Sequence, residues 1–213
     1  MPQNDKQPLV EVKIDPPRGI EYPVTDGVYA RQEVTANIEQ AVRLLEEANP
    51  DKIITLGGNC LVSQAPFDYL HGKYKNVGVI WIDTHPDVST VKDGYPNSHA
   101  KFLKDVGVDF KIQRESFLSH DEIKQFMSRF DHIFVHLDID VLDAKLFHST
   151  YFANPELVGD GSGSGRMTMA ELGDILQLIF NNSDVVGLTI AEYLPFDEHK
   201  LSQMFEGLDI FKD

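Results

Sequence analysis

Short apolar runs at four places in this 213-residue chain are followed by residues that can bind metal ions or move protons. The four following motifs are, in order, Gly57-Gly58-Asn59-Cys60, Asp83-Thr84-His85-Pro86-Asp87, Asp138-Ile139-Asp140 and the single residue Glu192. Carboxylate oxygens and imidazole nitrogens are common ligands of divalent metals and common acid–base groups. Four separate stretches of sequence therefore offer related chemistry.

The spacing within two of these motifs favours one shared site. Residues two apart in extended backbone point the same way, so Asp138 and Asp140 face together. Asp83, His85 and Asp87 keep the same spacing. Carboxylates at this density would repel one another and raise one another's pKa unless a cation lay among them. Oxygen and imidazole ligands suit manganese, iron or cobalt, and a pair of ions sharing carboxylates would activate a water molecule.

The apolar runs themselves are expected to be β-strands, at residues 51–56, 77–82, 132–137 and 185–190. The first contains a continuous β-branched stretch, which is typical of a parallel strand covered on both faces. The carboxyl ends of parallel strands share one edge of a sheet, where ligands bind. A pair of aspartates alone is common in turns, but the motifs together on consecutive strand ends indicate a metal site.

Amphipathic stretches between the runs are expected to be helices. Apolar residues at helical spacing predict a helix at 34–48. Two capping boxes, Ser119 with Glu122 and Thr168 with Glu171, mark the starts of two more. Strands alternating with helices predict an α/β fold, a three-layer αβα domain with a mainly parallel sheet.

We expect residues 1–213 to form a single domain. Residues 1–30, which contain five prolines, are expected to be an irregular lead-in with one strand at 9–14. The Gly-rich stretch 159–165 is expected to be a flexible loop, because it lacks the lysine of a phosphate-binding P-loop.

Composition excludes several classes of protein. The chain has 19 basic and 34 acidic residues and a net charge of −15, which opposes binding to nucleic acid or to anionic membranes and favours a cationic ligand. Its one cysteine cannot form an internal disulfide. No apolar run approaches the roughly 20 residues that span a bilayer, and the first residues are polar, so we expect a cytoplasmic protein without membrane contact.

The motifs carry a resemblance to a known family. GGNC, WIDTHPD, HLDIDVLD and the run ending before Glu192 resemble the metal and substrate motifs of the ureohydrolases, which include arginases, agmatinases and formiminoglutamases. Order and approximate spacing match over residues 34–208. The resemblance implies an arginase-like fold and two Mn²⁺ ions whose activated hydroxide attacks a guanidino or amidino carbon, releasing urea.

The resemblance also implies roles for the metal-binding positions. Asp83 and Asp138 correspond to carboxylates that bridge the two ions. Asp87 corresponds to a ligand of one ion, and His85 and Asp140 to ligands of the other.

Two further positions are implied to act on a small cationic guanidino substrate. Glu192 resembles the carboxylate that receives the guanidinium group. His99 lies where the family has a histidine that shuttles protons, although a purely structural role for it stays open.

Cys60 departs from the family pattern, because most members have a metal-binding histidine there. The sequence is similar here to an arginase-like branch that carries cysteine. A thiolate ligand would favour zinc or iron. The alternative is a small buried thiol beside a weak or empty metal position, which would leave a one-metal or catalytically poor site.

The chain also looks short, since a further strand–helix unit is expected near residues 102–109. These departures favour an alternative, a non-catalytic or one-metal relative with a regulatory or metal-binding role. A third and weaker alternative is a metal-dependent deacylase on a related scaffold.

The other histidines and the C-terminal stretch have simpler expected roles. His136, two residues before Asp138, is expected to support the site or pack in the core. The apolar residues of 201–211 are expected either to pack on the same domain or to form the interface of a homo-oligomer. Surface or packing roles are expected for the remaining histidines, His71, His120, His132, His148 and His199.

Overall fold

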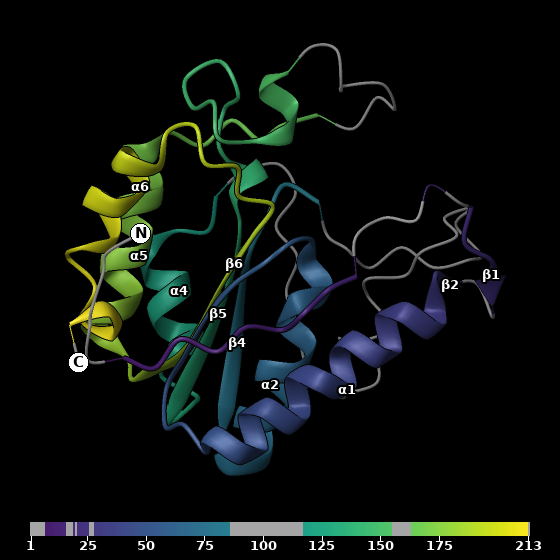
Figure 1. Ribbon diagram of the computed structural model, residues 1–213. Coiled ribbons are helices and arrows are strands. Elements are labelled where there is room, and N and C mark those ends of the chain that lie inside the picture. The colour runs from purple at the N-terminus through teal and green to yellow at the C-terminus, as the bar shows by residue number, and fades with distance from the viewer. Residues whose placement is uncertain are drawn as a thin grey trace.

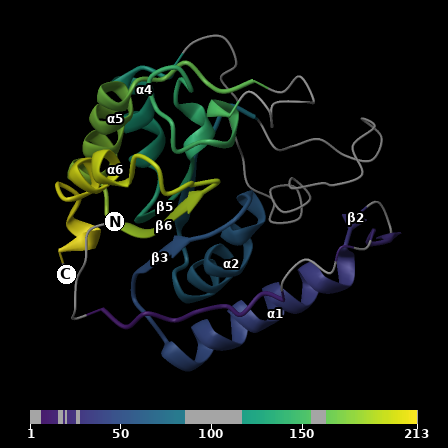
Figure 2. The same ribbon diagram turned by 45° about the horizontal axis from the view of Figure 1, so that its top comes forward.

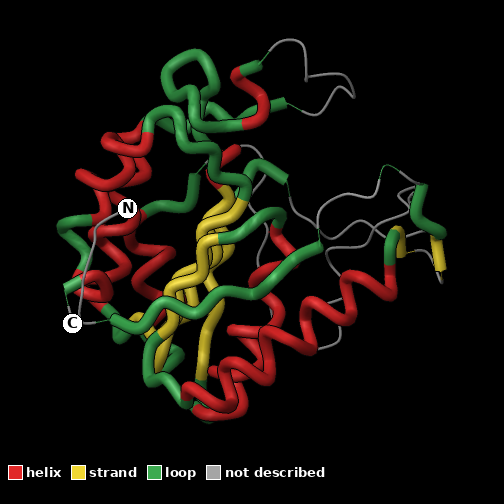
Figure 3. Tube along the Cα trace, viewed as in Figure 1, coloured by secondary structure: helices red, strands yellow, loops and turns green. Residues whose placement is uncertain are grey.

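A four-stranded parallel sheet forms the centre of the protein, which is seen here in a computed structural model (Figure 1). The structure describes residues 7–15, 19, 21–25, 28–85, 117–154 and 163–212. The strands are β3 (Ile53–Leu56), β4 (Val77–Ile82), β5 (His132–Asp138) and β6 (Val185–Ala191). They lie side by side in the order β3-β6-β5-β4, and all three neighbouring pairs are parallel. Figure 3 draws the strands in yellow, at the centre of the protein.

The four predicted strands are confirmed, with ends within two residues of the expected ones. Strand β4 has the predicted bounds, whereas β3 begins two residues later than expected. The expectation that both faces of β3 are covered is wrong. Only Ile53 is buried in this strand and Leu56 is 50% exposed, because β3 is an edge strand with one neighbour, β6.

Helices cover both faces of the sheet and confirm the three-layer α/β architecture. Helices α1 (Arg31–Ala48) and α2 (Gln64–Lys73) lie on one face, and α4 (His120–Met127), α5 (Met169–Asn182) and α6 (Glu198–Phe205) on the other (Figures 1 and 2). The order of the strands explains this division. The connection through α2 runs from β3 to the far edge, and the connection through α5 returns from β5 to β6. Crossovers of the same right hand that run in opposite directions place their helices on opposite faces.

Local signals in the sequence account for where the helices begin. Both predicted capping boxes are present, at the start of α4 and at the start of α5. Helix α1 begins three residues before the predicted start at residue 34 and ends, as predicted, at Ala48.

Each face of the sheet has its own apolar cluster. The larger cluster packs under α4, α5 and α6, where Leu172, Leu176 and Ile179 form the buried stripe of α5. The smaller cluster packs Phe67 and Leu70 of α2 against the opposite face of the sheet. In the C-terminal stretch Leu201 and Phe205 have no exposed surface and belong to the larger cluster, so this stretch packs on its own domain.

The lead-in is irregular over its described part, with one short hairpin. Strands β1 (Val24–Thr25) and β2 (Val28–Tyr29) form an antiparallel pair. The predicted strand at 9–14 is wrong: these residues have no regular structure, and Leu9 is 97% exposed. A strand needs a pairing neighbour, and this segment instead makes single contacts, such as the Lys13 amide to Gln40 Oε1 at 2.7 Å. Residues 102–109 lie outside the described residues.

Gly165 packs where segments that follow two strands meet. Its amide donates to the Asp140 carbonyl oxygen at 2.7 Å, and Thr84 Oγ1 donates to the same oxygen at 3.1 Å. A Cβ atom at Gly165 would overlap the carbonyl oxygen of Val141 and lie 2.5 Å from Thr84 Oγ1. The absence of a side chain here lets the chain after β4 and the chain after β5 approach each other.

We therefore expect Gly165→Ala to destabilise the protein by about 1–3 kcal/mol, the usual range for overpacking. Gly163→Ala is the matched control, because a Cβ atom at Gly163 meets nothing within 4 Å. It should change the free energy of unfolding by less than about 0.5 kcal/mol. Urea denaturation of both variants measures the difference, and equal stabilities would contradict the close packing.

Candidate metal centre

The loop after β3 places Cys60 at the carboxyl edge of the sheet. Asn59 Oδ1 accepts a hydrogen bond from the Leu61 amide at 3.2 Å and so begins a short 3-10 helix, η1 (Cys60–Ser63), which continues into α2. The Gly57 amide donates to the Ile190 carbonyl oxygen at 3.2 Å, which ties this loop to β6. Cys60 is consequently buried, at 6% exposure, among the strand ends.

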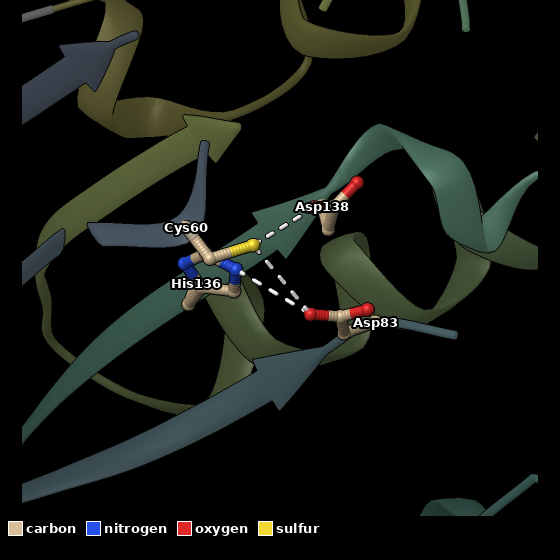
Figure 4. Close-up of side chains that lie close together, drawn as sticks. All are labelled: Cys60, Asp83, His136 and Asp138. Atoms are coloured by element: carbon tan, nitrogen blue, oxygen red, sulfur yellow. Dashed lines mark hydrogen bonds and ion pairs between the residues drawn. The ribbon is translucent and has the colours of Figure 1, made fainter. Parts of the chain in front are cut away.

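The Cys60 thiol lies against two of the predicted carboxylates. Its S–H group donates to Asp138 Oδ2 at 2.9 Å, and Sγ lies 3.8 Å from Asp83 Oδ2 (Figure 4). The indole Nε1 of Trp81 also donates to Asp83 Oδ2, at 3.0 Å. The cysteine is therefore in direct contact with both residues predicted to bridge two metal ions.

His136 lies on the same side of the sheet and faces the same carboxylate. It has no exposed surface, its Nε2 is 3.9 Å from Asp83 Oδ2, and its Nδ1 is 2.6 Å from Ser63 Oγ. Its ring stacks on Trp81, with centroids 3.6 Å apart and an interplanar angle of 14°, because the two residues are register partners in β4 and β5. Ligand atoms of Cys60, Asp83, His136 and Asp138 all lie within 4.8 Å of one another; we call these four residues group A.

A second set of ligand atoms lies on the other side of Asp83. His85 Nδ1 is 2.7 Å from Asp140 Oδ2 and 3.9 Å from Asp83 Oδ1. The His85 amide donates to Asp83 Oδ1 at 2.7 Å, and the Thr84 amide to Asp140 Oδ1 at 3.3 Å. Asp83, His85 and Asp140 form group B, with ligand atoms within 4.8 Å of one another. Asp83 thus turns Oδ2 toward group A and Oδ1 toward group B.

Glu192 lies close to Asp138, at the end of β5, and to Asp140, in the turn that follows it. Ligand atoms of Asp138, Asp140 and Glu192 also lie within 4.8 Å of one another. Glu192 has a φ of 54°, an uncommon backbone conformation outside glycine, and its amide donates to the Gly58 carbonyl oxygen at 2.7 Å. The bend after β6 therefore holds the predicted substrate carboxylate beside the two groups.

Six of the eight predicted site residues come together at this edge: Cys60, Asp83, His85, Asp138, Asp140 and Glu192. Asp87 and His99 lie outside the described residues. Within the part of the chain that the structure describes, the five histidines expected to have surface or packing roles contribute to none of these groups.

Among the described residues, Ser63, Trp81 and Thr84 contact the site although the sequence did not predict it. For His136 a signal existed in the sequence, since two residues of extended chain separate it from Asp138 and give both side chains the same direction.

The electrostatics of the centre favour a bound cation. Burial, together with the negative charges of Asp140 and Glu192, raises the pKa of Asp138 from 3.8 to about 8. The hydrogen bonds that Asp138 accepts from Cys60 and from the Asp140 amide act in the opposite direction but are outweighed. A divalent ion among these oxygens would replace the proton and remove the repulsion. The donor set of carboxylates, imidazoles and one thiol fits such an ion.

Comparison with known proteins identifies the family. The model of the arginase family matches residues 8–120, just over half of the chain. The chain belongs to the arginase family, as the resemblance of its motifs to ureohydrolases implied.

Its curated relatives and similar solved structures agree with this assignment. The chain is 27% identical to an agmatinase of Bacillus cereus, over 76% of this chain and 64% of that protein. It is 26% identical to an agmatinase of Halalkalibacterium halodurans, over 67% of this chain and 55% of that protein. The arginase of Bacillus caldovelox has the same fold, with a TM-score of 0.65 at 15% identity over 91% of this chain and 79% of that one. The formimidoylglutamase of Bacillus subtilis also has this fold, with a TM-score of 0.62 at 18% identity over 87% of this chain and 68% of that one.

The similarity covers only part of the curated relatives. The chain spans 55–64% of the length of these two agmatinases.

Among the described helices, none is both long enough and apolar enough to cross a membrane.

The raised pKa of Asp138 predicts that the metal-free protein loses stability as the pH rises. Between about pH 4 and 8 the native state keeps a proton that the unfolded chain has lost. The free energy of unfolding should therefore fall over this range, by at most about 1.4 kcal/mol per pH unit from this group. Urea denaturation in the presence of a chelator at several pH values measures the slope.

Asp138→Asn removes the titrating group, so its slope should be flatter than that of the unaltered protein. Asp174→Asn, which changes an exposed acid on α5, is the matched control and should keep the original slope. The same slope in the protein with and without Asp138 would show that burial does not raise the pKa of this carboxyl group.

Proposed function

We propose that this chain is a metal-dependent hydrolase of a linear guanidino or amidino compound, and that it releases urea by arginase- or agmatinase-like chemistry. The observation that carries the proposal is the position of Asp83, whose two oxygens face two different groups of ligand atoms. One carboxylate between two groups is the arrangement that a pair of ions requires. We propose Mn²⁺ as the ion, because oxygen and imidazole ligands predominate and the family resemblance implies it.

The residues of the centre have separate tasks in this proposal. Asp83, Asp138, His85 and Asp140 would hold the metal. Asp87, which the family resemblance also implies as a ligand, lies outside the described residues. The metal, when bound, supplies an activated water for attack on the guanidinium carbon. Because these ligands are held by backbone amides and by the strands, the site needs little rearrangement to align the reacting groups.

Glu192 and the overall charge act on the substrate. The Glu192 carboxylate is a charged partner for a guanidinium group. The net charge of −15 attracts a cationic substrate toward the protein before it binds. His99 is proposed to carry a proton to the leaving amine, a role suited to the near-neutral pKa of imidazole. Arginine and agmatine are the two substrates to compare, since both present a guanidinium group at the end of a flexible chain.

The test combines metal content with urea release from arginine and from agmatine. Protein loaded with Mn²⁺ should hold about two ions per chain and release urea. Asp140→Ala should lose metal and activity together. Glu192→Gln should keep the metal and lower kcat/KM at least about 100-fold, because the guanidinium loses its charged partner.

The exposed Asp174→Asn again serves as control and should match the unaltered protein in both readouts. Urea release that persists in Asp140→Ala, or that is absent from protein loaded with two ions, would contradict the proposal.

A second candidate, a non-catalytic or one-metal relative, is favoured by one observation. Cys60 occupies a predicted ligand position but donates its S–H proton to Asp138. In this alternative the unaltered chain binds one ion at most and releases no urea, whereas Cys60→His binds a second ion and gains activity. Metal analysis and urea assays of the two proteins side by side distinguish the candidates.

A further inference from the structure

Group A differs in chemistry from group B. Group A offers one sulfur, one imidazole nitrogen and two carboxylates, from Cys60, His136, Asp83 and Asp138. Group B offers only carboxylates and the imidazole of His85. Four ligands that include sulfur and nitrogen are the usual composition of a tetrahedral zinc site.

We propose that group A is a tetrahedral site selective for Zn²⁺, in which His136 is a metal ligand and Cys60 binds as the thiolate. The inference rests on the proposed function only in placing metal at this edge of the sheet, and it does not depend on urea release. It makes the centre asymmetric, with a softer position at group A and a harder one at group B.

The separations between the ligand atoms fit a single ion. With Zn–S near 2.3 Å and Zn–O or Zn–N near 2.1 Å, tetrahedral ligand atoms lie roughly 3.4–3.6 Å apart. Two separations, 3.8 Å from Cys60 Sγ to Asp83 Oδ2 and 3.9 Å from His136 Nε2 to the same oxygen, are slightly wider. The third, 2.9 Å from Sγ to Asp138 Oδ2, is shorter because a proton joins these atoms. For these three pairs, replacing that proton with an ion requires shifts of under 1 Å, and the remaining pairs of ligand atoms lie within 4.8 Å of each other.

The surroundings of His136 set its ring for metal binding. When Nδ1 carries the proton it donates to Ser63 Oγ, and the lone pair of Nε2 is then directed toward Asp83 (Figure 4). The stacked indole of Trp81 fixes the plane of the ring. A ligating histidine whose second nitrogen is held by another group is the general arrangement in metal sites. Ser63 is therefore a positioning residue for His136.

These ligands come from η1, from the end of β5 and from the chain directly after β4. Cys60 and Ser63 both lie in η1, three residues apart, while His136 and Asp138 lie two apart on β5. One short helix thus supplies the sulfur and the group that orients the imidazole. All four ligand side chains are buried or nearly so, and Cys60 is only 6% exposed, which limits the access of water to the sulfur.

Cobalt(II) titration of the metal-free 213-residue chain tests the assignment, because Co²⁺ reports on zinc sites by its spectrum. We expect a thiolate-to-cobalt charge-transfer band in the near ultraviolet and intense visible bands typical of tetrahedral geometry. One equivalent of Zn²⁺ should remove both, whereas a tenfold excess of Mn²⁺ should leave them unchanged.

Variants assign the individual ligands. Cys60→Ser should abolish the charge-transfer band, and His136→Gln should weaken the visible bands and cobalt affinity at least tenfold. Ser63→Ala keeps all four ligands and should weaken cobalt affinity about 10- to 100-fold, as loss of an outer hydrogen bond commonly does. His120→Ala, an exposed histidine of α4, is the matched control and His85→Ala the control for group B; both should keep the charge-transfer band.

Three results would overturn the inference: cobalt binding without a charge-transfer band, a band that survives Cys60→Ser, or unaltered spectra and affinity in both His136→Gln and Ser63→Ala. The outcome separates from that of the proposed function. A zinc-displaceable thiolate band in a protein that releases no urea supports the inference and contradicts the function. Urea release by manganese-loaded protein, together with the absence of a thiolate band in the cobalt-loaded protein, supports the proposed function and contradicts the inference.

Discussion

Negative charge gathered where four strands end is the constraint on which the rest of the centre depends. Asp138 and Asp140 are each 1% exposed, and both lie within ligand distance of Glu192. The protein itself offers only partial compensation, through the Cys60 thiol and the Asp140 amide, and the pKa of Asp138 stays high. Such an arrangement destabilises the metal-free protein and favours the binding of a cation, whose positive charge offsets the repulsion between these carboxylates. Metal affinity and folding stability are therefore linked through the same carboxylates.

The parallel sheet creates this concentration of charge by pairing segments far apart in the chain. Strands β3 and β6 are neighbours, so the loop containing Gly58 and the bend at Glu192 are joined by backbone hydrogen bonds. The β4–β5 pair sets Trp81 beside His136 and brings Asp83 near Asp138. The Thr84 hydroxyl and the Gly165 amide both donate hydrogen bonds to the Asp140 carbonyl oxygen. The positions of the charged groups are thus set by the register of the sheet and by a few main-chain contacts.

Local sequence patterns predicted the positions of the helices and strands well, but predicted less well which of them contact one another. Apolar runs and capping boxes predicted both ends of β4 and the starts of α4 and α5, because these signals act within a few residues. Parallel topology then predicted that Cys60, Asp83 and Asp138 share one edge. The exposure of Leu56 and the contact of His136 with Ser63 depend on which strands are neighbours, which no short stretch of sequence encodes. The strand expected at 9–14 was wrong for the same reason, since it has no pairing partner.

Cys60 considered alone suggests a weakened site, because a softer ligand lies where the family resemblance implies a histidine. Considered together with His136, Cys60 is part of a complete set of four ligands. The imidazole of His136 comes from β5 rather than from the loop after β3, and it reaches the same carboxylate, Asp83, as the cysteine. Group A therefore keeps a nitrogen donor and adds a sulfur, whereas group B keeps the harder ligands. In the proposed centre, Cys60 and His136 together set the metal preference of group A, while Asp83 connects group A to group B.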